Sequence, residues 1–144
     1  MFWEEAIPYF SKHELACKGT GIIKLDIRFA VALPYLRQEW GRPLTATSIC
    51  RSPSHNTDIG GHERSLHLTE NPVHNTDGTM AGDILWPTDN KLLFARFCWT
   101  RGWSVGLHDT FIHIDLRAKI GLQQAVFVYS NWSGFNPDLV TNVG

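Results

Sequence analysis

The most constraining feature of the sequence is the alternating run "FIHIDLR", which covers residues 111–117. This alternation predicts a β-strand, because successive side chains of a strand point to opposite faces. The three aliphatic residues inside the run share one face, which belongs in a hydrophobic core. The opposite face carries His113, Asp115 and Arg117. A strand with an imidazole, a carboxylate and a guanidinium on one side either borders a binding site or has an unusually polar surface.

The rest of the chain has the composition of an ordinary globular domain. Its 144 residues are 43% hydrophobic and 19% charged, and the formal net charge is −1. This balance provides no basic surface for nucleic acid or for an anionic membrane, so neither is expected as a partner. No apolar run approaches the ~20 residues of a transmembrane helix. The segment "MFWEEAIPYFSKHEL" has neither a basic start nor a long apolar stretch, so we do not expect it to act as a secretory signal peptide. We expect one domain over residues 1–144.

Cysteine and histidine are distributed unevenly along the chain. The three cysteines are widely spaced and form no CxxC pair, so we expect reduced, partly buried thiols rather than a zinc knuckle. Seven histidines are present, and four of them fall within twenty positions: His55, His62, His67 and His74. They lie in residues 51–78, a polar segment with little periodicity. Long irregular segments inside compact domains are usually functional.

The flanking segments predict regular secondary structure. One amphipathic helix is expected over residues 25–40, with a kink at Pro34 and a stop at Gly41. A second helix is expected in "TDNKLLFARFCWTRG", with Thr88 or Asp89 as its N-cap. Strands are expected in "PLTATSIC", "MAGDILW", "WSVGL" and "TFIHIDLR", the last two joined by a short turn. These elements predict a small α+β domain, with the His-rich loop near the last strands.

Three of these segments offer side chains of the metal-ligand type. "SLHL" contains His67, "AGD" contains Asp83 and "FIHID" contains His113. Histidine and aspartate are ligands for zinc, and three protein ligands with one open position are typical of a catalytic zinc site. Residue type alone is weak support, because a lone loop histidine is more often a surface hydrogen-bonding group.

The order of the motifs strengthens the metal interpretation. The runs "TATSICRSPSHNTDIGGHERSLHL", "GTMAGDI" and "VGLHDTFIHIDLR" resemble the zinc D-Ala-D-Ala carboxypeptidase family. This family shares its fold with the hedgehog signalling domain and includes phage L-Ala-D-Glu endopeptidases, and "YFSKHELACKGTG" is similar to its phage-type branch. The resemblance covers roughly residues 9–117, which leaves 118–144 as a C-terminal extension. It implies an antiparallel sheet with flanking helices.

The resemblance also implies roles for individual positions. His67, Asp83 and His113 would be the zinc ligands. Arg51 falls on the arginine that holds the carboxylate of the substrate peptide, a role that suits a planar guanidinium. Ser65 falls on a motif serine that would line the pocket. Zinc held by two neutral imidazoles and one carboxylate lowers the pKa of a bound water toward ~7. The implied reaction is peptide hydrolysis without a covalent intermediate.

The general base is the least defined part of this picture. Many family members place the catalytic acid three residues before the last histidine, where this chain has Thr110. Asp109 and Asp115 therefore compete for the role. We favour Asp115, which could instead be a hydrogen-bonding partner of His113. His108 is either a proton-handling group near the oxyanion or a turn residue.

A second departure from the family pattern is the spacing between the first two ligands. Asp83 lies sixteen positions after His67, because "TENPVHNTDG" extends the segment between them. We expect a solvated loop at the rim of the site, with His74 and Asp77 as residues that could reach the substrate or the metal. A longer loop costs little additional closure entropy, so the ligands are still expected to meet.

These observations predict a zinc peptidase that hydrolyses the peptide stems of bacterial peptidoglycan, as a carboxypeptidase or an endopeptidase. The phage-type resemblance suggests a phage-encoded enzyme, held in the host cytoplasm until lysis or carried on the virion. Two alternatives stay open. One is a virion structural or adaptor protein that docks to other virion proteins through "QQAVFVYSNW" as an edge strand. The other is a zinc-binding module without catalysis.

Overall fold

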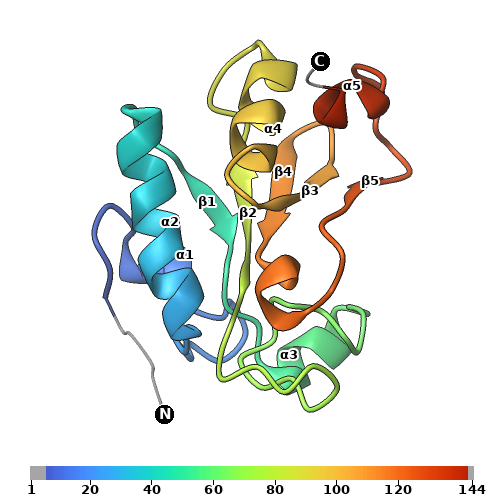
Figure 1. Ribbon diagram of the computed structural model, residues 1–144. Helices are drawn as coiled ribbons and strands as arrows, with labels where there is room; N and C mark the ends of the chain where they lie inside the picture. Colours follow the sequence, from blue (N-terminus) through green and yellow to red (C-terminus); the bar gives the residue numbers. More distant parts are fainter. Residues whose placement is uncertain (1–5, 143–144) are drawn as a thin grey trace.

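In the computed structural model, which describes residues 6–142, five strands form one sheet (Figure 1). The strands are β1 (Ala46–Ser48), β2 (Ala81–Leu85), β3 (Ser104–Leu107), β4 (Phe111–Asp115) and β5 (Val126–Val128). Their order in the sheet is β1-β2-β4-β3-β5. Strands β1, β2, β4 and β3 pair with one another in antiparallel fashion, whereas β5 pairs with β3 in parallel. The α+β class is confirmed, but the sheet is mixed because the C-terminal segment returns alongside β3.

The described helices are α1 (Lys12–Leu15), α2 (Ile27–Trp40), α3 (Pro53–Asp58), α4 (Lys91–Trp99) and α5 (Asp138–Thr141), with one 3-10 turn, η1 (Arg117–Ile120). The longest, α2, starts after Asp26, whose carboxylate accepts a hydrogen bond from the backbone N–H of Arg28. It ends at Gly41 in the left-handed conformation, as predicted. No helix within residues 6–142 combines the length and apolar character that crossing a bilayer requires.

Helix α4 begins later than the sequence predicted. Its N-cap is Asn90, whose side-chain oxygen accepts a hydrogen bond from the backbone N–H of Leu93 at 3.1 Å. Thr88 and Asp89 lie outside the helix, so the predicted cap was wrong. Asparagine is as good a cap as aspartate, and here it is the residue whose side chain reaches the exposed N–H groups of the first turn.

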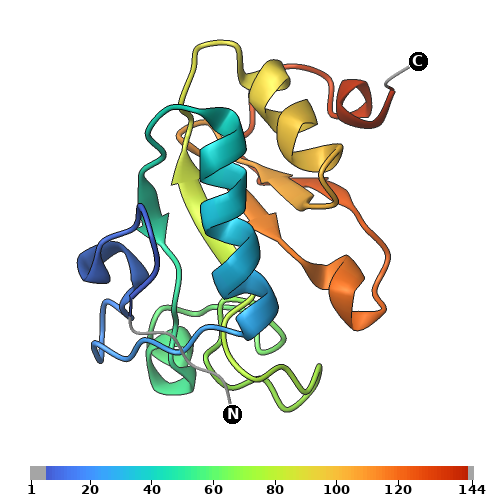
Figure 2. The same ribbon diagram turned by 60° about the vertical axis from the view of Figure 1, so that its left-hand side comes forward.

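The two faces of the sheet differ in chemistry. One face carries buried aliphatic residues that pack against α2 and α4, namely Ile84, Val105, Leu107, Ile112 and Ile114. Trp40 of α2 and Phe94 of α4 are in edge-to-face contact, with ring centroids 4.8 Å apart. Figure 2 shows α2 lying across the sheet on this side. The three cysteines are free and buried, as expected. The other face carries the polar side chains predicted from the alternating run.

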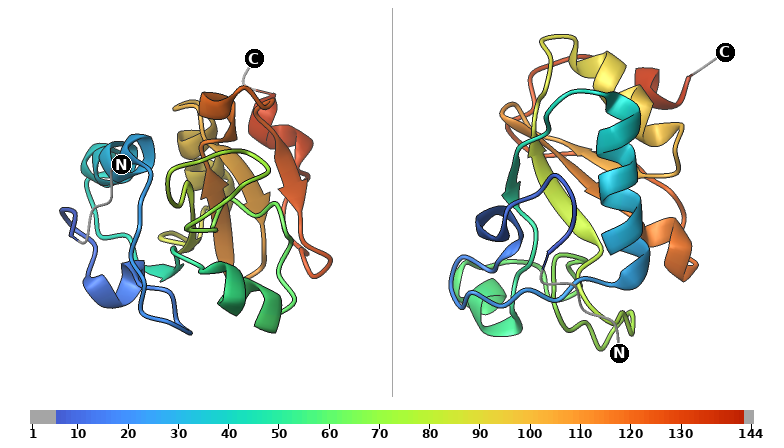
Figure 3. Two further views of the ribbon diagram at one scale, coloured as in Figure 1. Left: turned by 90° about the horizontal axis from the view of Figure 1, so that it is seen from below. Right: turned by 90° about the vertical axis from the view of Figure 1, so that its left-hand side faces the viewer.

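The irregular segment 51–78 lies beside one end of the sheet, together with α3 (Figure 3). Backbone hydrogen bonds join two parts of this segment. They run from Arg51 N–H to the His67 carbonyl at 2.9 Å and from Thr69 N–H to the Arg51 carbonyl at 3.0 Å. A further bond runs from Met80 N–H to the Leu66 carbonyl at 2.8 Å. Apart from the short α3, the prediction of a long irregular segment is confirmed. These bonds fix the backbone on both sides of His67.

The C-terminal segment is folded onto the rest of the chain. Strand β5 lies next to β3, and α5 lies beside α4 (Figure 1). The guanidinium of Arg96 donates to the carbonyls of Leu139 at 2.7 Å and Asn142 at 3.1 Å. Val140 is fully buried. The segment predicted as an extension therefore completes the sheet and part of the core.

Candidate metal centre

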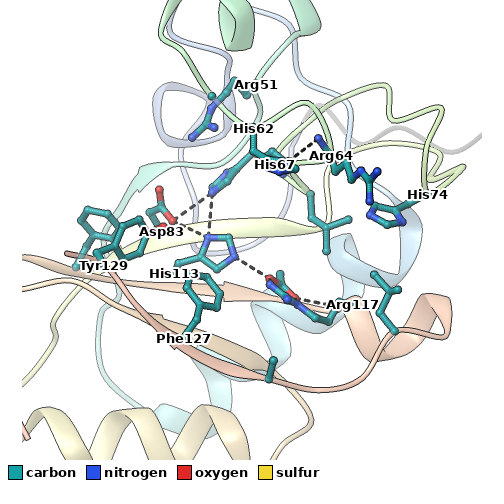
Figure 4. Close-up of a pocket in the computed structure, with 17 residues that line it drawn as sticks. Arg51, His62, Arg64, His67, His74, Asp83, His113, Arg117, Phe127 and Tyr129 are labelled. Carbon is teal, nitrogen blue, oxygen red and sulfur yellow. Dashed lines mark hydrogen bonds and ion pairs between the residues drawn. The ribbon is translucent and has the colours of Figure 1, made fainter. Parts of the chain in front are cut away.

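Three ligand-type side chains converge on the polar face of the sheet (Figure 4). Asp83 in β2 and His113 in β4 are directly opposite each other in the antiparallel register, and His67 reaches them from the irregular segment. His67 Nε2 is 3.2 Å from Asp83 Oδ1 and 3.3 Å from His113 Nδ1, and the remaining pair is 3.1 Å apart. All three side chains are buried. The structure thus brings together the three residues predicted as ligands.

In each of the two imidazoles, the outer nitrogen, which points away from the cluster, lies within hydrogen-bonding distance of an acceptor oxygen. His67 Nδ1 lies 2.8 Å from the carbonyl oxygen of Ile49, and His113 Nε2 lies 2.8 Å from Asp115 Oδ2. Each outer nitrogen must therefore carry the ring proton. In a neutral imidazole the inner nitrogen, which faces the cluster, then has a free lone pair. Together with Asp83 Oδ1, three lone pairs then face one another with no proton between them. Such an arrangement requires either a cation or an additional proton.

The spacing of the three atoms fits a metal ion. Zinc bonds of about 2.0–2.2 Å at tetrahedral angles separate neighbouring ligand atoms by about 3.3–3.6 Å. The observed separations of 3.1–3.3 Å lie at or just below this range. The cluster also lines an open pocket of about 690 Å³. His67, Asp83 and His113 can therefore hold a metal and leave a coordination position directed toward a ligand.

Electrostatics in the metal-free protein follow from this geometry. Burial opposes a charged imidazole, but hydrogen bonds to Asp115 and Asp83 outweigh burial and raise the pKa of His113 to about 9. Burial also opposes ionisation of Asp83, yet the neighbouring His67 and His113 hold the pKa of this carboxyl well below its usual range. Near neutral pH the metal-free cluster consequently holds a proton in the place where a cation would bind.

Asp115 is engaged on both of its oxygens. Oδ2 accepts from His113 Nε2 at 2.8 Å and from the Arg117 guanidinium at 2.7 Å. Oδ1 accepts from the backbone N–H of Arg117 at 3.0 Å and from its Nε at 2.9 Å. The side chain is fully buried, and despite this burial Arg117 and His113 hold its pKa well below its usual range. Asp115 thus contacts the nitrogen of His113 that points away from the cluster.

Arg51 and Ser65, both predicted near the substrate, line the same pocket. The Arg51 guanidinium donates to Asn56 Oδ1 at 3.1 Å, and Asn56 in turn donates to the backbone carbonyl of His62 at 2.9 Å. Buried Asn56 therefore holds the guanidinium in place. Ser65 Oγ accepts a hydrogen bond from the backbone N–H of His67 at 3.2 Å, so this serine also shapes the turn that presents His67.

The structure does not bring His108 or Asp109 to the pocket wall. Both lie in the turn between β3 and β4. The Asp109 carboxylate accepts from the backbone N–H of Ser133 at 2.8 Å and from its hydroxyl at 2.9 Å. His108 Nδ1 accepts from the backbone N–H of Thr110 at 3.1 Å, and its Nε2 lies 2.8 Å from the side-chain amide of Asn131. These two residues connect the turn to the C-terminal segment.

The inserted loop places one of its two candidate residues at the pocket. His74 lines the rim and lies beside Arg64, which the sequence analysis did not select (Figure 4). His74 is not part of the metal cluster. Asp77 forms an ion pair with Lys24 at 3.5 Å. Asn71 is buried and donates to the carbonyls of Arg64 and of Ser65, which ties the loop to the turn before His67.

One wall of the pocket comes from the C-terminal segment, which also escaped the sequence analysis. Gly106 of β3 pairs with His113 on one side and with Phe127 of β5 on the other, so one row of the sheet runs from Asp83 to Phe127. A Cβ on Gly106 would lie 2.4 Å from the Phe127 ring. Because glycine has no side chain, this ring can cross the strand and approach His113, with ring centroids 5.4 Å apart. Tyr129 follows on the same face.

Two imidazoles and one carboxylate that could hold a cation, at the side of an open pocket, are typical of metal-dependent enzymes. The family model described as Peptidase M15 matches residues 8–115, more than half of the chain. The chain belongs to this family of metal-dependent peptidases, as the resemblance of its motifs implied. A search of curated proteins and a search of solved structures found no match. The matched range ends before β5, so Phe127 and Tyr129 lie outside it.

Proposed function

We propose that this protein is a zinc peptidase that hydrolyses the peptide stems of bacterial peptidoglycan. The observation that supports it best is the group of three inward-facing lone pairs on His67, Asp83 and His113, which could hold a cation beside a pocket. Zinc bound there would polarise the scissile carbonyl and make a water molecule nucleophilic near neutral pH. The Ile49 carbonyl and Asp115 would fix the two imidazoles in the tautomer that binds metal.

The charges of the pocket support an anionic peptide as the substrate. Neither Arg51 nor Arg64 pairs with a carboxylate among the described residues, although both line the pocket. An unpaired guanidinium beside the metal would hold a carboxylate of the substrate bidentately and orient the neighbouring peptide bond. Peptidoglycan stems carry such carboxylates at their C-terminus and on their side chains. The resemblance to phage-type members supports the further proposal that the enzyme is phage-encoded.

The test combines metal content with hydrolysis. Zinc per chain is measured by elemental analysis for the wild type and for His113→Ala, and release of peptides or D-alanine from purified muropeptides is followed by mass spectrometry. We expect one zinc per chain, lost together with hydrolysis in the variant. His13→Ala is the control, because His13 is exposed in α1, far from the cluster in sequence. A wild-type protein that binds no metal would refute the proposal.

A second candidate is a zinc-binding module without hydrolysis, and one observation favours it. The carboxylates that line the pocket among residues 6–142 are Asp83 and Asp115. The first belongs to the metal cluster, and both oxygens of the second are occupied by His113 and Arg117. Apart from the ligand-type Asp83, no carboxylate that lines this pocket within residues 6–142 therefore has a free oxygen for the role of general base. Zinc at one per chain with no hydrolysis of any muropeptide would support this candidate.

A further inference from the structure

Tyr129 is the most informative pocket residue without an assigned role. It follows β5, on the same face of this strand as Phe127, and both side chains line the pocket. Figure 4 shows its ring beside Asp83, at the edge of the metal cluster. Its backbone N–H donates to the carbonyl of Leu107 at 3.0 Å, which extends the parallel pairing with β3 and fixes the position of the residue.

The ring of Tyr129 is held by three aromatic neighbours. Its centroid is 5.4 Å from those of His108 and Phe111, both in edge-to-face geometry, and 5.8 Å from that of Phe127. These contacts orient the ring without using its hydroxyl. The side chain is half-buried, and its hydroxyl forms no hydrogen bond with another of the described residues. A fixed ring with an unused hydroxyl at a pocket is available to a ligand.

The protonation state of the hydroxyl suits a donor. The ordinary pKa of a tyrosine phenol is about 10, and burial of the Tyr129 side chain disfavours its charged form. The phenol consequently keeps its proton across the neutral range. A neutral donor next to a metal site can give a hydrogen bond to an oxygen that gains negative charge, and donors of this kind are strongest in sites that exclude water.

We propose that Tyr129 is a catalytic residue that donates a hydrogen bond from Oη to the oxygen of the scissile carbonyl as negative charge develops there. This proposal rests on the proposed peptidase function. Tyr129 forms no covalent bond to the substrate and transfers no proton. Its contribution is larger for the tetrahedral transition state than for the planar substrate, because the carbonyl oxygen gains charge between the two. The C-terminal segment would thus supply part of the catalytic machinery from outside the family match.

The experiment compares Tyr129→Phe with the wild type, both loaded with zinc. Phenylalanine keeps the ring and its three aromatic contacts, so metal content and melting temperature should stay at wild-type values. We expect kcat on muropeptides to fall about 10²–10³-fold with KM changed less than threefold, the usual loss for one oxyanion donor. Tyr35→Phe is the matched control, because Tyr35 is exposed on α2 and does not line this pocket.

A binding measurement separates this proposal from the proposed function. A phosphinate dipeptide analogue of D-Ala-D-Ala, with tetrahedral oxygens at the reacting position, is titrated into both zinc-loaded proteins by calorimetry. Affinity that falls at least tenfold in Tyr129→Phe supports the donor role, even if the wild type hydrolyses no muropeptide and the peptidase function fails. Equal kcat and equal phosphinate affinity in the two proteins would overturn the role of Tyr129 and leave the peptidase function intact. A wild type that neither binds phosphinate nor hydrolyses muropeptides would overturn both.

Discussion

Replacement of Asp115 by asparagine tests whether this residue positions a metal ligand or accepts a proton in catalysis. Asp115 presents two oxygens to four donors, one from His113 and three from Arg117, at 2.7–3.0 Å. Asparagine offers one acceptor oxygen and one amide group that only donates. If the oxygen faces the imidazole, the amide opposes the donors of Arg117. If it faces Arg117, the amide opposes the N–H of His113.

The magnitude follows from this conflict. Loss of the carboxylate weakens the bond that fixes the tautomer of His113 and lowers the electron density of its metal-binding nitrogen. Replacement of such a partner typically lowers metal affinity about 10–100-fold, which corresponds to about 1.4–2.8 kcal/mol of binding free energy. The Arg117 side chain is 26% exposed and can turn its guanidinium to water, so the fold should survive the substitution.

The assay is a zinc competition titration with a chromophoric chelator, run on the wild type, Asp115→Asn and Asp58→Asn. Asp58 is an exposed residue at the end of α3 and provides a control for the loss of one negative charge. The reasoning predicts a zinc Kd raised 10–100-fold in Asp115→Asn alone, with unchanged circular dichroism. Wild-type zinc affinity combined with loss of hydrolysis would refute it, and would identify Asp115 as the general base that the sequence favoured.

Three further predictions address the pocket and its charge. Gly106→Ala places a Cβ 2.4 Å from the Phe127 ring, so we expect a loss of about 1–3 kcal/mol in unfolding free energy and a raised KM, measured by denaturant titration and steady-state kinetics. Arg51→Lys replaces a bidentate donor by a point charge, so KM for peptides that end in a carboxylate should rise about tenfold, whereas peptides amidated at that end should show no change. The raised pKa of His113, about 9 against an ordinary 6.5, stabilises the metal-free fold fully below pH 6.5, and this contribution is lost as the pH rises to about 9. Zinc binds the neutral imidazole, so loading near neutral pH should release about one proton, which calorimetry in buffers of different ionisation enthalpy measures; no release would contradict the protonated cluster.

The sequence predicted the metal-binding face because a strand has a strict period of two residues. In the run from Phe111 to Arg117, the alternation places His113 on the polar face, opposite the aliphatic residues. In the strand "MAGDILW", Asp83 is the polar residue that can lie opposite His113, and the two are paired in the structure. His67 was harder, since it lies in an irregular segment whose path no periodicity fixes. Its assignment came from the resemblance of the surrounding motif, and the structure places it at the cluster.

The sequence could not predict which side of an imidazole a carboxylate contacts. Asp115 lies two residues from His113 on the same face, and this position suits either a general base or a positioning residue. The distinction depends on the ring orientation of His113, which is set by three-dimensional contacts with Asp83 and His67. Local spacing holds no information about that orientation. The same reason explains Asp109, whose hydrogen bonds to Ser133 depend on the path of the C-terminal segment.

The sequence analysis missed the pocket wall formed by β5, because the alternating pattern of a strand does not show which other strand it pairs with. "QAVFVYS" alternates in a way that is compatible with a short strand, with Phe127 and Tyr129 on one face. Whether that face meets the metal site depends on which edge the strand joins, in which direction and in which register. The sequence analysis considered this segment as an edge for docking to another protein. In the structure it pairs with β3 of its own chain.

Gly106 lies between the residues that would bind the metal and the residues of β5 that shape the pocket. The metal cluster is built from residues 67–113, inside the range that matches the family, whereas Phe127 and Tyr129 come from outside it. Since Gly106 leaves the sheet bare between His113 and β5, the side chain at position 127 can change the shape of the pocket without displacing a ligand. Phe127→Leu should therefore alter the ratio of kcat/KM between two muropeptides and leave the zinc Kd at its wild-type value. If zinc affinity fell together with activity, the ring would be a support for His113 and this expectation would be wrong.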